Sequence, residues 1–275
     1  MKAIKYFLAL SLVVTGLTSC VQEPNQDKVE KKWPNTINTV EVGEFVLVKR
    51  DTAGYTMGDA KMATSSPEHT VRFSKSFYMC KTEVTQAQWK AIMGENPSDN
   101  EGLIKEGENP DNYPVNNISL DEANAFVEAL NAASGRKFAI PTEAQWEWAA
   151  MGGILSNGYK FSGSNDMSEV AWNLSNSDSY LSEVGKLKAN ELGIYDMTGN
   201  VEEWTADKYG AYKATEITDP TGSTSGSYYV VRGGSAFDNN EDVLSVKSRN
   251  KVKNTDKKYT RGLRLILEEP LKSDK

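Results

Sequence analysis

The sequence predicts one domain of mixed α-helical and β-strand structure, and three observations support this prediction. Apolar runs of strand length occur early, at Glu44–Val48, Thr70–Phe73 and Phe77–Met79. Three segments with helix-capping signals follow in the middle of the chain. After Gly152 the chain is dominated by Gly, Ser, Asn and Asp, so we expect loops and short strands there. No repeat or linker divides the globular part, which favours a single domain.

Three helices are expected from capping boxes, in which a Ser or Thr caps the first turn and a Glu or Gln three residues later caps in return. The pairs are Thr85 with Gln88, Ser119 with Glu122, and Thr142 with Gln145. Gly135 is expected to end the second helix, because glycine readily adopts the left-handed conformation found there. In the third helix, Trp146 is expected in the core, and Glu143 and Glu147 are expected to bond nearby loops.

The N-terminal segment has the layout of a secretory signal peptide. Residues 1–19 carry two lysines and then a short apolar run, which ends just before Cys20. This ending resembles a bacterial lipobox, in which the cysteine is lipidated; the alternative is an ordinary signal peptide with a chance cysteine. Residues 20–36 are polar and charged, so we expect a flexible tether, followed by the globular domain at 37–270. The protein is therefore expected on a membrane surface of the bacterial cell envelope, in the periplasm or at the outer membrane.

Composition and charge exclude some classes of function. The 275 residues carry a net charge of −7, so an acidic surface would repel phosphate backbones, and nucleic acid is not an expected partner. Of the two cysteines, lipidation of Cys20 leaves Cys80 alone, so no internal disulfide is expected. Cys80 lies in a strand-like segment, and we interpret it as a small buried residue rather than a nucleophile. The single histidine, His69, is interpreted as structural or exposed.

One segment, residues 190–204, combines turn-forming glycines, carboxylates and an aromatic residue in the sequence NELGIYDMTGNVEEW. It resembles the central signature of the formylglycine-generating enzyme (sulfatase-modifying factor) family. Val231–Ser235 reads VRGGS and Ile140–Ala150 reads IPTEAQWEWAA, and both resemble further motifs of that family. The resemblance extends from about Phe45 to Leu267. It implies the family's fold, a single α+β domain with little regular secondary structure that is related to C-type lectins.

The resemblance also implies a calcium site in the loop of the central signature. The implied ligands are the side chains of Asp196 and Glu203 and the carbonyl oxygens of Gly199 and Val201. Carboxylates mixed with backbone carbonyls are the ligands that calcium takes in proteins. The alternative is a loop held only by its own hydrogen bonds. A second calcium site of the family lies upstream, and Asn176 and Ser177 occupy that region here.

The chain lacks the two cysteines with which the family's enzymes bind copper(I). By resemblance, Asp238 stands at the first cysteine position, and Val243, or Asp242 with a one-residue shift, stands at the second. A carboxylate does not replace a thiolate as a ligand of copper(I), so neither copper nor oxidation by the family's route is expected. Glu202 replaces a tryptophan that lines the pocket of the enzymes. The related sulfoxide synthases need three histidines, and this chain has one.

The resemblance places Ser235, Asp238, Arg249 and Glu202 in or near the pocket of the enzymes, whereas Arg264 is expected to be structural. Our leading hypothesis is an envelope lipoprotein whose domain is a non-oxidase binding or assembly module for other envelope proteins or a secreted peptide. One alternative is an enzyme that matures secreted peptides or proteins through the same pocket with residues other than cysteine. Another alternative is calcium-dependent binding of glycans.

Overall fold

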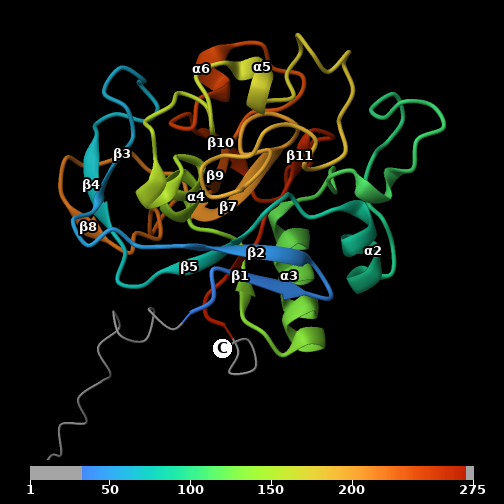
Figure 1. The fold of residues 1–275 in the computed structure, drawn as a ribbon, viewed down its shortest axis with the longest axis horizontal. Helices are drawn as coiled ribbons and strands as arrows, with labels where there is room; N and C mark the ends of the chain where they lie inside the picture. The colour runs from blue at the N-terminus through green and yellow to red at the C-terminus, as the bar shows by residue number, and fades with distance from the viewer. Residues whose placement is uncertain (1–32, 271–275) are drawn as a thin grey trace, which may run out of the picture.

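The computed structural model describes residues 33–270 (Figure 1). Cys20 and the predicted signal peptide lie outside the described residues. Within residues 33–270, no helix has both the length and the apolar character needed to cross a bilayer. Helices and strands are mixed along the chain and are joined by long loops, in agreement with an α+β domain of low regular secondary structure.

A five-stranded antiparallel sheet crosses the middle of the molecule (Figure 1). Its strands, in spatial order, are β1 (Thr36–Thr39), β2 (Gly43–Val48), β5 (Phe77–Cys80), β12 (Ile266–Leu267) and β6 (Phe138–Ala139). The predicted strands Glu44–Val48 and Phe77–Met79 are confirmed as β2 and β5, which pair with each other. All four residues of β5 are buried, which explains its unbroken apolar run. Cys80 is among them, as predicted.

Two smaller sheets complete the β-structure. The four-stranded sheet contains, in spatial order, β10 (Asn250–Lys253), β9 (Tyr228–Arg232), β7 (Glu202–Lys208) and β11 (Arg261–Gly262). The three-stranded sheet contains β3 (Tyr55–Met57), β4 (His69–Arg72) and β8 (Ile217–Thr218). The predicted strand Thr70–Phe73 is therefore confirmed as β4 with a shift of one residue. β7 begins inside the signature segment, so this sheet holds the signature loop in place.

Short helices cover these sheets. The helices are α2 (Gln86–Met93), α3 (Leu120–Ser134), α4 (Glu143–Ala150), α5 (Met167–Val170) and α6 (Glu241–Leu244), with 3₁₀ turns η1 (Pro110–Asn112) and η2 (Gly153–Leu155). The three predicted capping boxes are all present, at the starts of α2, α3 and α4. Gly135 ends α3 with a φ of 68°, as expected for a left-handed C-cap.

The core lies on both sides of the five-stranded sheet. On one side α2 and α3 pack together, and the rings of Trp89 and Phe126 stack at 4.7 Å. On the other side α4 packs between β3, β7 and β9, with Trp146 fully buried. Packing already begins at Trp33, which is 8% exposed and stacks on Tyr78 at 5.7 Å. This residue belongs to the range that the sequence assigns to the tether.

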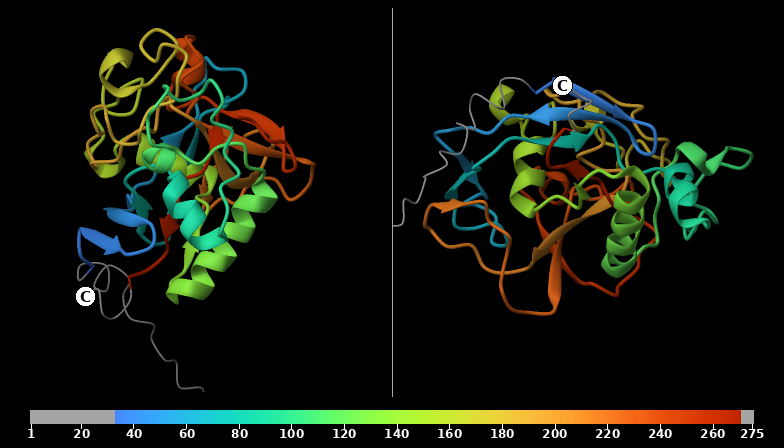
Figure 2. Two further views of the ribbon diagram at one scale, coloured as in Figure 1. Left: turned by 90° about the vertical axis from the view of Figure 1, so that its right-hand side faces the viewer. Right: turned by 90° about the horizontal axis from the view of Figure 1, so that it is seen from below.

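Loops rather than regular elements build the opposite end of the molecule. The short helices α5 and α6 lie together there, far from β1 and from the end of α3 (Figures 1 and 2). Backbone hydrogen bonds tie these loops to one another across long sequence separations, for example Leu174 N to Asp238 O at 3.0 Å. The segment that follows the VRGGS motif at Val231–Ser235 is thereby fixed against the segment that precedes the central signature, residues 190–204.

Candidate functional site

The signature segment, residues 190–204, bends through four residues in the left-handed conformation. The φ angles are 80° at Gly193, 58° at Asp196, 82° at Gly199 and 55° at Asn200. At Gly199 only glycine fits, because a Cβ there would lie 2.0 Å from the carbonyl oxygen of Trp172. The Asn200 amide donates to that same carbonyl at 3.0 Å. The loop therefore wraps closely around Trp172, and this contact accounts for the glycine in the motif.

Glu203, the last acidic residue of the signature, is held by two strong partners. Arg264 donates to both carboxylate oxygens, with its Nη2 at 2.8 Å and its Nε at 3.1 Å. Trp146 Nε1 donates to Oε2 at 2.7 Å. Neither Glu203 nor Arg264 is exposed. Arg264 is therefore structural, as predicted, and the same contact anchors Glu203 in the interior.

Two further carboxylates lie near this ion pair. Asp196 is 5% exposed and accepts a hydrogen bond from Gly185 N at 2.6 Å. Glu83 is fully buried and accepts from Asn200 Nδ2 at 3.2 Å. Burial raises the pKa of Asp196 to about 6, with a contribution from Glu203. Burial, followed by repulsion from Asp196 and Glu203, also raises the pKa of Glu83. Three acids thus share one guanidinium, and their excess negative charge calls for protons or a cation.

Of the two carboxylates that the resemblance implies as ligands, Glu203 has both oxygens bonded, to Arg264 and Trp146. Asp196 offers a carboxylate with one oxygen bonded to Gly185, and the left-handed turns at Gly199 redirect the backbone carbonyls. Within residues 33–270, no group of three or more His, Cys, Asp or Glu side chains is arranged to hold a metal ion by itself. A cation in this loop would therefore need the carbonyl oxygens of Gly199 and Val201, the mixed ligand set that the resemblance implies.

The second predicted cation region is occupied by local hydrogen bonds. Asn176 accepts from Asn173 N at 2.9 Å through Oδ1 and donates to Ala171 O at 2.9 Å through Nδ2. Ser177 Oγ donates to Ala236 O at 2.8 Å. These bonds join the loop before the signature to the segment after the VRGGS hallmark. The side chains of Asn176 and Ser177 act here as structural links.

The position that the resemblance assigns to the first cysteine is taken up by a closed turn. Asp238 accepts from Ser235 N at 2.9 Å and from Ser235 Oγ at 2.7 Å through the same oxygen. Val243, at the second position, lies in α6 and is 38% exposed. Ser235 and Asp238 are therefore brought together, as the sequence suggests, but their polar groups are directed at each other.

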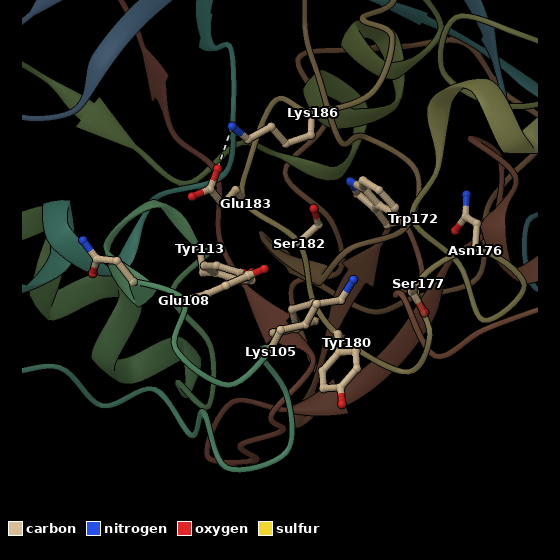
Figure 3. A pocket seen from close by; sticks show the side chains of 12 residues that line it. Lys105, Glu108, Tyr113, Trp172, Asn176, Ser177, Tyr180, Ser182, Glu183 and Lys186 are labelled. Carbon is tan, nitrogen blue, oxygen red and sulfur yellow. Dashed lines mark hydrogen bonds and ion pairs between the residues drawn. The ribbon is translucent and has the colours of Figure 1, made fainter.

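A cavity of about 380 Å³ is connected to this turn through Ser177, which lines the cavity and bonds to Ala236 O. We name it the Trp172 cavity. Its lining residues are Lys105, Glu108, Asn109, Tyr113, Trp172, Asn176, Ser177, Tyr180, Leu181, Ser182, Glu183 and Lys186. Figure 3 shows Ser182 between Tyr113 and Trp172, with Lys105 beside the ring of Tyr180. Trp172 also packs with Ala236 and Phe237, so the wall of the cavity and the turn at 235–238 form one unit.

The other two residues predicted for the pocket lie elsewhere. Glu202 accepts from Arg261 at 2.9 Å and pairs with Lys258 at 3.3 Å. Arg249 forms a bidentate ion pair with Glu143, with Nη2 to Oε2 at 2.6 Å. Arg249 and Glu143 line a second cavity of about 510 Å³, beside α4. The structure therefore does not gather Ser235, Asp238, Arg249 and Glu202 at one cavity.

The buried ion pairs of α4 were not apparent from the sequence. Glu143 and Glu147 were expected to bond loops, and Glu147 does accept from Gly58 N at 2.9 Å. Their main partners, however, are cations: Arg249 binds Glu143, and Arg232 and Lys247 bind Glu147. These partners lie 85 to 106 residues away in the chain, so no local pattern marks them. Glu83 was missed for the same reason.

Comparisons with known proteins agree on the fold and on the family motifs. Residues 22–269 match the protein family described as the sulfatase-modifying factor enzyme 1-like domain. Chaperone protein LppX of Paenibacillus barcinonensis is 33% identical over 215 residues, which cover 61% of this chain and 72% of LppX. Formylglycine-generating enzyme of Mus musculus is 30% identical over 173 residues, which cover 56% of this chain and 45% of that enzyme.

Solved structures give the same result. Treponema denticola variable protein 1 superposes with a TM-score of 0.75 at 30% identity, over 85% of this chain and 98% of that chain. PvdO from Pseudomonas aeruginosa superposes with a TM-score of 0.68 over 86% of this chain and 99% of that chain. PvdO is 20% identical, so this second likeness concerns the fold alone.

Proposed function

Because this chain belongs to the formylglycine-generating enzyme (sulfatase-modifying factor) family, we propose that it is a binding or assembly module without the family's cysteine-based oxidation. Its site is the Trp172 cavity, and its ligand is a polypeptide segment of an envelope protein. The observation that carries this proposal is the turn at Ser235 and Asp238. The carboxylate at the first cysteine position is bonded to Ser235, and the Trp172 cavity is joined to this turn by the bond of Ser177 to Ala236 O.

The missing sulfur chemistry supports binding over oxidation. Copper(I) prefers soft thiolates, and Asp238 offers a hard carboxylate that is already bonded to Ser235. The whole sequence contains two cysteines, and Cys80 is buried in β5. Burial raises the pKa of the Cys80 thiol, which keeps it protonated and unreactive. No thiol is thus available beside the turn at 235–238 for the family's reaction.

The chemistry of the Trp172 cavity suits a polypeptide. Tyr113, Trp172 and Tyr180 offer flat aromatic surfaces, which are common at protein-binding sites because they contribute large contacts at low entropic cost. Charges of both signs lie on the rim, with Lys186 bonded to Glu183 at 2.6 Å. Such a mixture of charges suits a peptide, which has alternating donors and acceptors, better than it suits a uniformly charged polymer.

The similarity to LppX also supports the binding of a polypeptide. That protein is named a chaperone, and its match at 33% identity covers 61% of this chain and 72% of LppX. A chaperone acts by holding another polypeptide, which is the kind of ligand that we propose for this cavity. The predicted lipid at Cys20 would hold the domain at a membrane surface, close to envelope proteins.

We also propose that calcium binds the signature loop and stabilises it. The ligands would be the carboxylates of Asp196 and Glu203 and the carbonyl oxygens of Gly199 and Val201. Support comes from the three buried acids at this place, whose negative charge exceeds that of the single guanidinium of Arg264. The role of calcium would be structural, because Glu203 faces the interior of the domain.

The proposal is tested by capturing partners from solubilised membranes. The full-length protein, Ser182→Trp and Ser74→Trp are used as baits, and bound proteins are identified by mass spectrometry. Ser182→Trp fills the Trp172 cavity, whereas Ser74 is an exposed residue that lines neither cavity. We expect a fixed set of envelope proteins with wild type and Ser74→Trp, and its loss with Ser182→Trp at an unchanged melting temperature. Equal capture by all three baits would refute the assignment of this cavity.

A further inference from the structure

The second cavity, beside α4, has the features of an independent binding site. We name it the Asp207 cavity. It has a volume of about 510 Å³ and lies between β3, β4, the start of α4, the end of β7 and the loop 210–224. Its lining residues are Met57, His69, Glu143, Ala144, Asp207, Lys208, Gly210, Ala211, Tyr212, Lys213, Thr215, Ile217, Pro220, Gly222, Ser223, Thr224 and Arg249. None of these residues lines the Trp172 cavity.

One carboxylate in this cavity is only partly satisfied. Asp207 is 2% exposed, and its Oδ2 accepts a hydrogen bond from Glu143 N at 2.9 Å. Its Oδ1 accepts no hydrogen bond from any residue in 33–270, although Asp207 lines the cavity. Because Asp207 lines the cavity, a ligand that enters it can supply the donor that this carboxylate oxygen lacks.

The neighbouring charged groups do not supply this donor, because they are bound to each other. Glu143 accepts from Arg249 through both oxygens and from the hydroxyl of Tyr212 at 2.9 Å. The remaining guanidinium nitrogen of Arg249 donates to Gly210 O at 2.8 Å. Arg232 pairs with Glu147 through Nη2, and its Nε lies 3.4 Å from Glu143 Oε1. Within residues 33–270 none of these cations donates a hydrogen bond to Asp207, although the Nε of Arg232 has no hydrogen-bond partner.

A second acceptor lies in the same wall. The Nδ1 of His69 lies 3.3 Å from Pro67 O, and a carbonyl oxygen can only accept, so Nδ1 carries the proton. In the neutral ring this leaves Nε2 as an acceptor. The ring packs on Tyr212 with the centroids 4.6 Å apart. The remaining walls are apolar at Met57, Ala144 and Pro220.

We propose that the Asp207 cavity binds a small organic amine in its protonated form, with the ammonium group on Asp207 and the apolar stem against Met57 and Pro220. An ammonium donates up to three hydrogen bonds and carries the positive charge that Asp207 lacks. The apolar walls select an amine on a hydrocarbon stem over a bare inorganic cation. Lys208 and Lys213 are the cations at the rim; Lys213 is exposed, and Lys208 is half-buried. They limit the ligand to a single positive charge.

Protonation of Asp207 competes with this ligand. Burial and the nearby Glu143 raise the pKa of Asp207 to about 7, against the attraction of Arg249 and Arg232. Because an ammonium binds the ionised carboxylate, affinity should rise as the pH rises through 7. From about pH 6 to about pH 8 the ionised fraction grows from about a tenth to about nine tenths, so the apparent affinity should increase roughly ninefold.

The experiment measures binding of benzylamine to the full-length protein by calorimetry, with benzyl alcohol as the uncharged probe. Asp207→Asn keeps an oxygen for Glu143 N and removes only the charge. Asp242→Asn is the matched control, because Asp242 is exposed and lines neither cavity. Ala211→Trp blocks the cavity at an exposed lining residue, and its melting temperature reports whether the fold is intact.

We expect saturable binding of benzylamine that strengthens roughly ninefold from about pH 6 to pH 8. Binding should weaken at least about tenfold in Asp207→Asn and Ala211→Trp, and it should be unchanged in Asp242→Asn. Benzyl alcohol should bind at least about tenfold more weakly than benzylamine. The proposal is overturned by absence of benzylamine binding up to about 10 mM, by equal affinity in Asp207→Asn, or by equal affinity for the alcohol. None of these results bears on the Trp172 cavity.

Discussion

Arg264 forms a bidentate ion pair with Glu203 at a place where neither side chain reaches solvent. The shortest contact joins Nη2 and Oε1 at 2.8 Å, and the side chains are 0% and 1% exposed. Arg264 also donates to the carbonyl oxygens of Cys80 and Tyr195. One guanidinium therefore ties the central sheet, the signature loop and β7 together.

Removal of this buried charge should destabilise the folded protein strongly. In Glu203→Gln the guanidinium of Arg264 loses its bidentate ion pair without gaining access to water. We expect the free energy of unfolding to fall by about 3–5 kcal/mol, measured by urea denaturation. The control is Glu216→Gln, which breaks the exposed pair of Glu216 with Arg72 and should leave stability essentially unchanged. A loss in Glu203→Gln no larger than in this control would show that the buried pair does not hold the loop.

Removal of calcium should lower the melting temperature. If calcium binds the signature loop of the folded protein only, its presence at about 100 times its Kd adds about 2.7 kcal/mol of stability. Chelation by EGTA should therefore lower the melting temperature of wild type. The melting temperature of Asp196→Asn should respond much less, because the substitution removes one of the two charged ligands. Identical curves for wild type with calcium and with EGTA would contradict the calcium site.

The stability contributed at Asp207 should depend on pH. Burial and Glu143 raise the pKa of Asp207 to about 7 from the ordinary value of 3.8. Between these two values the folded state holds a proton that the unfolded chain has released, so stability falls as the pH rises from about 4 to about 7. Above about pH 7 the loss is complete, and the free energy of unfolding is lower by up to about 4 kcal/mol.

Asp207→Asn lacks this titration, so its stability relative to wild type should increase from about pH 5 to about pH 8. Urea denaturation of both proteins at the two pH values measures the difference directly. Asp242→Asn is the control for the same substitution at an exposed position. A difference between wild type and Asp207→Asn that does not change with pH would show that Asp207 is ionised in the folded protein throughout this range.

The N-terminal cap of α3 should contribute modestly to the free energy of unfolding. Ser119 accepts from Glu122 N at 3.2 Å, and Glu122 in turn accepts from Ser119 N at 2.9 Å. Ser119→Ala leaves the first turn without its side-chain acceptor, so we expect a loss of about 1 kcal/mol in chemical denaturation. Ser74→Ala, at an exposed loop position, is the control. A loss equal to that of Ser74→Ala would mean that tertiary packing alone fixes the start of α3.

Features that depend on neighbouring residues were predicted well from the sequence. The capping boxes of α2, α3 and α4 obey short-range rules, and Gly135 ends α3 as its conformational freedom suggests. The strands β2 and β5 were visible because burial on both faces leaves a continuous apolar run. The family resemblance then implied the fold class, a single α+β domain with little regular secondary structure.

Features that depend on distant pairing were not predictable in the same way. Glu83 reaches the signature loop across 117 residues, and Glu143 reaches Arg249 across 106. A single sequence holds no signal for such contacts, because acidic residues are frequent in this chain. The family resemblance placed Arg249 and Glu202 with Ser235, whereas Arg249 forms a buried ion pair with Glu143 and Glu202 forms one with Arg261. Both cavities arise from loops whose course follows from these long-range contacts.

The central claim is that the domain retains the family's fold and has lost the sulfur chemistry of its enzymes. The most direct measurement is aerobic incubation of the purified protein, supplied with copper(I), with a cysteine-containing peptide, followed by mass spectrometry. We predict that the peptide cysteine is recovered without conversion to an aldehyde, because Asp238 and Val243 offer no thiolate. Formation of the aldehyde at a rate that depends on the protein would contradict the account.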